Sequence, residues 1–194
     1  MPNIETAKAQ DIISAAISKG MQSREGARAH GVFTLTCHDS EGKLKWTRDI
    51  PNLVVNVGLQ DMNTQYFKGS AYTAAWYIGL YGAASSNNPA AGDTASSHAG
   101  WTEVTGYSQA TRVAATFGTA TTADPSVISN SASPAAFSIN TTVTVGGAFL
   151  ISNSTKGGTT GILFSASDYQ SPGDRSTVSG DTVNVTYTFN LDAV

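Results

Sequence analysis

Charge is the scarcest feature of this 194-residue sequence. Asp, Glu, Lys and Arg together make up 13% of it, about half their share in an ordinary soluble domain. The net charge is −3, and proteins that bind nucleic acid through its phosphates normally carry clustered Lys and Arg. This balance argues against nucleic acid as a partner. Hydroxyl groups take the place of charge at the surface, because 24 Thr and 22 Ser are present.

Cysteine is almost absent as well. Cys37 is the only one, so the chain has neither an intrachain disulfide nor a zinc site built on several cysteines. Alternation puts Phe33, Leu35 and Cys37 on one face of a strand, which favours a buried thiol over a reactive one.

Long apolar runs are missing too. No run approaches the roughly 20 residues of a membrane-spanning helix, and no basic segment followed by an apolar one resembles a secretion signal. We therefore expect no membrane partner, and synthesis in a cytosol.

What the chain does have is period-two alternation, together with 19 Gly and many Thr, a composition typical of strands and turns. The predicted fold is all-β, a β-sandwich or jelly roll of about eight strands with an N-terminal helical arm and one short internal helix. The expected strands span 32–38, 43–50, 76–81, 112–118, 135–139, 142–151, 161–166 and 181–191.

Two local signals refine this prediction. Residues 39–42, with Gly42 at the end, have the composition of a hairpin turn between the first two strands. Asn56 is the expected N-cap of the internal helix, which carries Leu59, Met62 and Tyr66 on one stripe and ends by Gly69.

The N-terminal region differs from the rest. Residues 3–19 have the pattern of a helix that Gly20 ends, and its few large apolar residues fit a core helix and a docking arm equally well. Residues 21–31 have the composition of an extended, partly mobile connector. We therefore divide the chain into an arm with connector, 1–31, and a β-domain, 32–194. The expected interface residues of the arm are Ile4, Ile12, Ile13, Ile17, Arg24 and Arg28.

Two stretches predict long loops. Residues 82–100 contain no Val, Ile, Leu, Met or aromatic side chain, and residues 119–134 are similarly polar. Structureless loops longer than about 12–15 residues are uncommon in compact domains and are usually functional or disordered. Both stretches are expected to pack against something else or to stay mobile.

Catalytic patterns are weak, so we predict that the protein is not an enzyme and uses no cofactor. No two of the three histidines have the spacing of a metal pair, and no Gly-x-Ser-x-Gly elbow occurs. Asp93, His98 and Glu103 allow a cation site, but a solvated loop explains them as well. Residues 156–161, KGGTTG, order their Lys and Gly unlike a phosphate-binding loop and favour a glycine-rich turn.

Aromatic residues allow one more interpretation. A sugar-binding platform is possible in principle, but burial in a β-sandwich is the simpler role for such side chains. The residues concerned are Trp46, Trp76, Trp101, Tyr77, Tyr81 and Tyr107.

Several segments give the chain a family resemblance over roughly residues 30–190. They are NLVVNVGL at 52–59, WYIGL at 76–80, DTASSHAGWTE at 93–103, GAFL at 147–150, KGGTTG at 156–161 and GDTVNVTY at 180–187, with Tyr107 and Arg112 between them. In these segments the chain resembles structural proteins of the tailed-bacteriophage virion. The residues that we take as the family motif are Trp76, Tyr77, Asp93, His98, Trp101, Glu103 and Arg112.

The resemblance implies a non-enzymatic role on the virion after synthesis in the host cytoplasm. A capsid cement (decoration) protein, which binds the shell of major capsid protein and clamps neighbouring capsomers, suits one β-domain with an arm. Self-association, as a trimer, is the expected oligomeric state. The alternatives are a tail, neck or fibre component that binds a host receptor or glycan, and a depolymerase that uses carboxylates such as Asp93 and Glu103.

Overall fold

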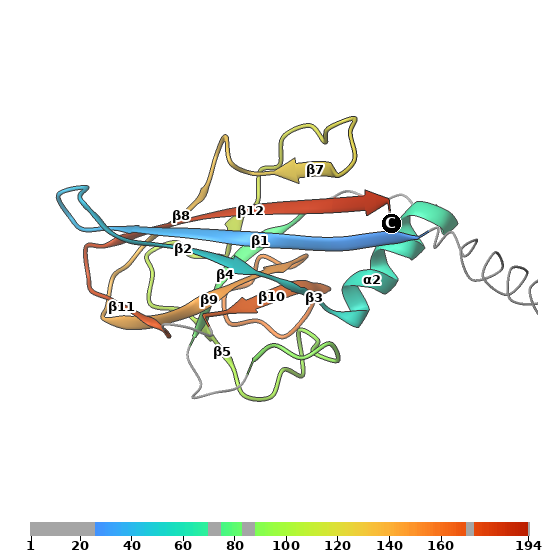
Figure 1. Cartoon of the computed structure of the whole chain (residues 1–194). Helices are drawn as coiled ribbons and strands as arrows, with labels where there is room; N and C mark the ends of the chain where they lie inside the picture. Colours follow the sequence, from blue (N-terminus) through green and yellow to red (C-terminus); the bar gives the residue numbers. More distant parts are fainter. Residues whose placement is uncertain (1–25, 70–74, 83–87, 170–172, 194) are drawn as a thin grey trace, which may run out of the picture.

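The computed structural model describes residues 26–69, 75–82, 88–169 and 173–193, which form two antiparallel sheets (Figure 1). Sheet A has the order β2–β1–β12–β7, with β8 also on β12, and sheet B has the order β3–β10–β9–β4–β5, with β11 on β9 and β6 on β4. The strands of sheet A are β1 (Ala27–His38), β2 (Leu44–Pro51), β7 (Ser126–Ser129), β8 (Ala135–Ser138) and β12 (Thr182–Ala193). Those of sheet B are β3 (Leu53–Val54), β4 (Tyr77–Gly82), β5 (Thr102–Val104), β6 (Val113–Ala114), β9 (Val143–Ile151), β10 (Leu163–Asp168) and β11 (Arg175–Thr177). The all-β prediction is confirmed, although the described residues hold twelve strands rather than about eight.

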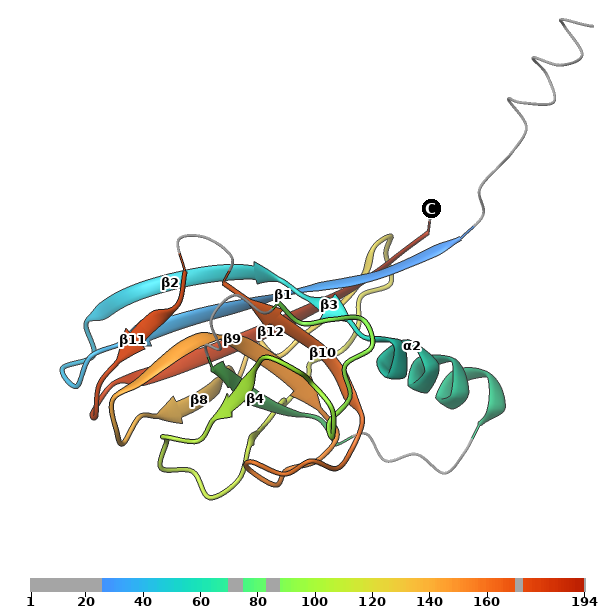
Figure 2. The same ribbon diagram turned by 90° about the horizontal axis from the view of Figure 1, so that it is seen from below.

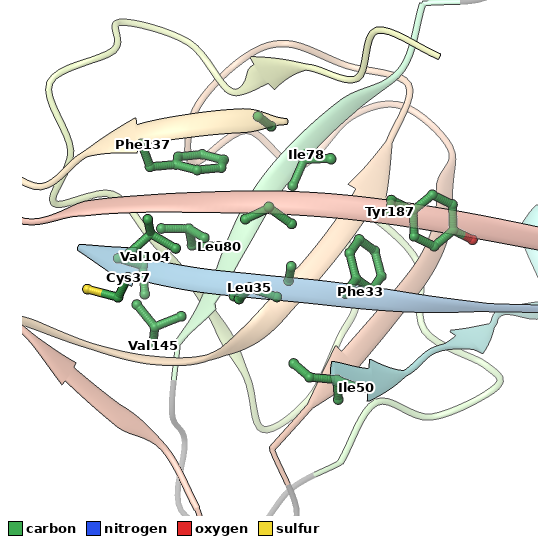
Figure 3. Close-up of a cluster of buried hydrophobic side chains, with 14 of the residues drawn as sticks. Phe33, Leu35, Cys37, Ile50, Ile78, Leu80, Val104, Phe137, Val145 and Tyr187 are labelled. Carbon is green, nitrogen blue, oxygen red and sulfur yellow. The ribbon is translucent and has the colours of Figure 1, made fainter. Parts of the chain in front are cut away.

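The two sheets pack face to face over one hydrophobic core (Figure 3). Sheet A contributes alternate residues such as Phe33, Leu35 and Val185, and sheet B contributes Ile78 and Leu80. All five are completely buried. Cys37 belongs to the same layer and is 0% exposed, as its position in the alternation predicts. Burial raises the pKa of its thiol to about 11, so the thiol stays protonated at neutral pH.

Sheet B is apolar on its second face as well. Tyr81, Phe149 and Ile151 point away from sheet A and form a second buried cluster with Ala95 and Trp101. Residues 88–101 therefore cover the outer face of sheet B, which explains why β4 is apolar on both sides. In its described part, the loop predicted at 82–100 packs against the protein's own sheet, although it has no large apolar side chain before Trp101.

The first and last strands pair along their whole length, from Ala27 with Ala193 to His38 with Thr182. The hairpin from β1 to β2 is confirmed, and Gly42 has φ 81°, the left-handed conformation that glycine adopts without strain. However, β1 begins at Ala27, five residues before the expected start. Residues 27–31 of the predicted connector are strand, and Arg28 pairs with Asp192 instead of lying in an arm.

The internal helix is confirmed with two differences. It runs as α2 (Asn56–Asn63) and continues as a π-helix, η1 (Thr64–Lys68), up to Gly69. Val55, not Asn56, is the N-cap, because its backbone is extended, with φ −79° and ψ 162°, and its carbonyl accepts the N–H of Leu59 at 3.1 Å. The N–H of Asn56 donates to the carbonyl of Ala91 at 2.8 Å. Gly58 lies directly against β10, where an added Cβ would be 2.4 Å from the carbonyl oxygen of Phe164.

The predicted apolar stripe of this helix is only partly buried. Met62 packs against the core, whereas Leu59 is 41% and Tyr66 83% exposed. The wider π-helical turn changes the direction in which side chains leave the helix after Asn63, so the spacing from Met62 to Tyr66 no longer keeps one face.

Two further expectations need correction. The second predicted loop, 119–134, contains β7, which pairs with β12. Between β7 and β8, the buried side chain of Asn130 accepts a hydrogen bond from the N–H of Tyr187 at 2.6 Å and donates to the carbonyl of Val185 at 3.2 Å, so an amide replaces strand pairing there. The strand predicted over 112–118 is reduced to β6. The predicted helix 3–19 lies outside the described residues. The same holds for five of the expected interface residues, Ile4, Ile12, Ile13 and Ile17 of this helix and Arg24 of the connector.

Candidate functional site

Five of the seven motif residues meet on the outer face of sheet B: Asp93, His98, Trp101, Glu103 and Arg112. They come from the loop 88–101, from β5 and from the segment before β6. Together with residues 157–159 of the loop between β9 and β10 they surround a small hollow of about 250 Å³, except Asp93, which lies behind Trp101. Of the other two, Tyr77 packs against the same outer cluster, whereas Trp76 faces Phe164 of the main core.

Trp101 anchors the loop 88–101 to the sheet. It is 4% exposed, its ring stacks on Tyr81 with centroids 4.9 Å apart, and it also contacts Phe149. Its indole N–H donates to Asp93 Oδ2 at 2.9 Å. The same carboxylate oxygen accepts the N–H of Ala90 at 3.0 Å, so Asp93 joins the loop's backbone to its aromatic anchor.

His98 covers the outer side of this anchor. Its ring lies 4.0 Å from that of Trp101 at 30°, and its Nδ1 is 3.0 Å from the carbonyl oxygen of Trp101. The half-buried imidazole therefore closes a local turn and shields the indole from water.

Arg112 and Glu103 form an ion pair that is nearly inaccessible, with side chains 3% and 8% exposed. The guanidinium donates from Nε to Glu103 Oε1 at 3.0 Å and from Nη2 to Glu103 Oε2 at 2.7 Å. Two more hydrogen bonds go to the carbonyls of Asn153, at 3.0 Å, and Gly158, at 2.8 Å. Glu103 Oε2 also accepts the N–H of Gly157 at 2.8 Å. We call these five residues the Arg112 cluster.

The loop that the Arg112 cluster holds is the glycine-rich turn between β9 and β10. Gly157 has φ 71°, which confirms the prediction of a turn at KGGTTG. Lys156 bends back over the ring of Tyr107, 4.3 Å from its centroid, and donates to the carbonyls of Tyr107 and Gln109. Its ammonium is thus committed to backbone oxygens rather than directed at an anion.

The hydrogen bonds and the ion pair of these residues hold neighbouring loops in a fixed position. The arrangement ties three loops together through groups that already have partners, and a buried, hydrogen-bonded guanidinium is suited to holding carbonyls in place. Asp93, His98 and Glu103 do not converge on a common point, because each contacts a different partner. In the described part of the chain, no three His, Cys, Asp or Glu side chains form a group able to hold a metal ion.

The platform interpretation of the aromatic residues is wrong for three of them. Trp101, Tyr81 and Tyr107 are 4%, 1% and 1% exposed, so they present no ring face to a sugar. Burial raises the pKa of the Tyr107 hydroxyl as well. Trp46, Trp76 and Tyr77 are half-buried against the two clusters.

Sequence reasoning missed the partners of Arg112. The carbonyls of Asn153 and Gly158 are backbone groups, and no side-chain pattern marks them. Phe149, whose ring lies 5.3 Å from the guanidinium, is marked in the sequence only as part of the segment GAFL. The two glycines of KGGTTG are the one available signal, since they mark a tight turn whose backbone is free to face a donor.

No family model, curated protein or solved structure matches this chain. Among the described helices, none is long and apolar enough to cross a membrane.

A second buried carboxylate lies where β12 begins. Asp181 is 2% exposed; its Oδ2 accepts hydrogen bonds from Lys45 Nζ and from the N–H of Val178 at 2.9 Å, and lies 3.8 Å from the Cys37 thiol. Burial alone would raise the pKa of this carboxyl, but Lys45 and the N–H of Val178 outweigh it and hold the pKa below its ordinary value. The hydrogen bond to Asp181 likewise raises the pKa of Lys45.

These shifts predict acid sensitivity of the fold. Since the folded-state pKa of Asp181 is depressed, its stabilising contribution is present above the unfolded-state value of about 3.9 and is lost as pH falls through the folded value. The contribution of Lys45 also stabilises the fold but has the opposite pH dependence. Because its folded-state pKa is raised, the contribution is present below its ordinary pKa and is lost only in strong alkali, as pH rises through the folded-state value. We expect Asp181→Asn to flatten the fall of unfolding free energy below about pH 5, as measured by urea denaturation at a series of pH values. Lys45→Met should weaken the same fall, and parallel curves for wild type and Asp181→Asn would contradict the assignment.

Proposed function

We propose that this protein is a structural component of a tailed-bacteriophage virion that acts as a capsid cement (decoration) protein on a shell of major capsid protein. The observation that carries the proposal is the use made of the motif residues. Their polar groups form hydrogen bonds with one another and with the backbone of the loops, as in the pairs Arg112–Glu103 and Trp101–Asp93. The motif therefore sets the shape of a surface, which is what a protein that works by fitting a lattice needs.

The arrangement of the chain ends supports a clamp. Ala27 pairs with Ala193, so both ends of the described chain lie at one end of the sandwich, beside α2 (Figure 2). A segment that precedes residue 26 therefore starts from that end, whereas the loops on the outer face of sheet B offer a second surface for contact. The pairing of the first and last long strands in the middle of sheet A also suits a jelly roll, and we propose this connectivity as the finer description of the fold.

The proposal includes self-association, as a trimer near a local three-fold axis of the shell, and the absence of any catalytic activity. Many copies of a modest interface then stabilise the shell together. The four isoleucines of residues 3–19 are the apolar residues that we assign to contact with a neighbouring shell subunit. Each buried Ile contributes about 1.5–3 kcal/mol before the cost of ordering the segment.

The test is binding of the purified full chain to shells of the major capsid protein that lack it. We expect saturable binding, and we expect deletion of residues 1–20 to leave the β-domain folded but to weaken shell binding roughly tenfold or more, which corresponds to about 1.4 kcal/mol. Circular dichroism provides the folding control, because the deletion removes no described strand. Equal binding by the truncated and full-length proteins would refute the role of the arm.

A tail, neck or fibre component that binds a host receptor or glycan is the alternative, and copy number separates it from a cement protein. Quantitative mass spectrometry of virions should find hundreds of copies if the protein covers the shell, and a dozen or fewer if it belongs to the tail or neck. The burial of Trp101, Tyr81 and Tyr107 favours the shell over a glycan-binding role.

A further inference from the structure

An apolar groove lies at the end of the sandwich where both chain ends emerge. It has a volume of about 840 Å³ and is lined by residues of α2, η1 and the paired ends of β1 and β12. Figures 1 and 2 show α2 at the end of the sandwich where these two strand ends lie. Its walls are formed by Ala27 and Ala29 of β1, Leu191 of β12, and Leu59, Tyr66 and Phe67 of the helix. None of the residues that line it is charged.

The exposure of this groove is unusual. Tyr66 and Phe67 are 83% and 78% exposed, and their rings pack edge to face on each other, with centroids 5.0 Å apart. Leu59 and Leu191 are about two-fifths exposed beside them. Contiguous apolar surface of this kind on a protein normally marks a contact site.

We propose that residues 3–19 of the same chain occupy this groove in the free protein. The described chain begins at Gly26, and the next residue, Ala27, is part of the groove wall. The seven residues 20–26 span at most about 25 Å when extended, and a helix of seventeen residues is about 25 Å long. The segment therefore reaches the whole length of its own helix α2–η1 without any rearrangement of the sheets.

The chemistry of the segment fits this surface. Ile4, Ile12, Ile13 and Ile17 supply β-branched apolar side chains, and its two acidic residues, Glu5 and Asp11, are balanced by Lys8 and Lys19. No net charge therefore opposes docking onto an uncharged groove.

The covalent link favours a chain's own segment over that of a second copy. A short connector holds a tethered segment at an effective concentration in the millimolar range, which a second copy does not reach in dilute solution. Docking also covers the isoleucines and the two exposed rings at the same time. This inference goes beyond the proposed function, and it holds whether or not the protein belongs to a virion.

The test is a disulfide trap in the full-length chain. Ile13→Cys combined with Leu59→Cys places one thiol on the segment and one on the groove wall, while Cys37 is completely buried and does not compete. On mild oxidation we expect most chains to form a disulfide within one molecule, in a fraction that does not change on tenfold dilution. Mass spectrometry of the linked peptides identifies the bond. Ile13→Cys with Glu41→Cys, at the exposed hairpin tip far from the groove, is the matched control and should trap several-fold less.

Two results would overturn the inference. One is trapping no greater than in the Glu41 control, and the other is a product that is mainly a disulfide-linked dimer, which would assign the groove to a second copy. A further variant guards against a trivial failure to fold. Tyr66→Ser with Phe67→Ser, in the trap background, changes two exposed residues and should reduce trapping several-fold without lowering the melting temperature.

Discussion

Arg112→Ala is expected to destabilise the protein by about 3–5 kcal/mol, because it leaves the Glu103 carboxylate buried without its counter-charge. The substitution also removes the donors that hold the carbonyls of Asn153 and Gly158. Urea denaturation measures the loss. Lys43→Ala, which changes an exposed cation in the hairpin turn, is the control and should stay within about 0.5 kcal/mol of wild type.

The same variant gives a local readout that global stability does not. Once the Arg112 cluster is broken, the loop between β9 and β10 loses its attachment to Glu103. Trypsin should then cleave after Lys156, whose side chain bends back to Tyr107 in the folded protein. We expect a fragment that ends at Lys156 from Arg112→Ala under conditions in which the wild type is not cleaved at Lys156.

Two substitutions at these positions separate charge from geometry. Arg112→Lys keeps the charge but lacks the planar fork that serves four acceptors, so its stability should lie between those of the wild type and Arg112→Ala. A double-mutant cycle with Glu103→Gln should show coupling, because the two side chains share two hydrogen bonds. If Arg112→Ala lowered the unfolding free energy by less than about 1 kcal/mol, the ion pair of Arg112 and Glu103 would be solvated and would not stabilise the loops.

Strand alternation predicted the long elements of the fold well. β12 extends close to its expected bounds, because one of its faces is buried against the opposite sheet and alternation records that burial. β9 does so as well, because both of its faces are buried and its apolar run is nearly continuous. The alternation starts β1 five residues too late, because alternation marks only the part of a strand that packs on the core. Residues 27–31 pair with the end of β12 beyond the core, so their small and polar side chains carry no apolar period.

Strand alternation does not predict very short strands or contacts between segments that are distant in the sequence. β3 and β6 have two residues each, too few to show any period, and they exist because a neighbouring strand offers hydrogen bonds. β7 lies in a polar stretch, where Asn130 bridges the gap to β8 through its side-chain amide. The motif includes Glu103 and Arg112, but their ion pair forms only because β5 and β6 both pair with β4, which brings β5 close to the segment before β6.

For the candidate site, the sequence indicates the residues but not their structural role. Asp93, His98 and Glu103 were expected to be solvated or to hold a cation, whereas they serve an indole, a carbonyl and a guanidinium. The alternation at residues 76–81 already indicates a strand that is partly apolar on both faces, but it does not show which segment covers the outer face of the sheet. A sheet of that kind needs a cover, and the polar loop 88–100 provides one with Ala95 and the following Trp101 as its apolar contacts.

Trp101→Ala is accordingly expected to destabilise the protein by about 3–5 kcal/mol, as buried aromatic truncations do. The loss combines a cavity against Tyr81 and Phe149 with the loss of the indole hydrogen bond to Asp93, whose Oδ2 keeps only the N–H of Ala90. Thermal unfolding gives the magnitude, and hydrogen exchange of residues 88–101 should rise more than that of β1 and β12. If the loss is local, the two central strands keep their protection.

The matched variants divide this loss into packing and hydrogen bonding. Trp101→Phe retains a ring against Tyr81 but removes the indole donor, so it should cost about 1.5–3 kcal/mol, the usual contribution of a hydrogen bond to a charged group. Asp93→Asn keeps an oxygen able to accept from both Ala90 and Trp101, and should cost less than Asp93→Ala. If Trp101→Phe were as damaging as Trp101→Ala, the indole hydrogen bond would outweigh stacking. If it were neutral, Asp93 would hold the loop through Ala90 alone, and the indole would act only as an apolar cover.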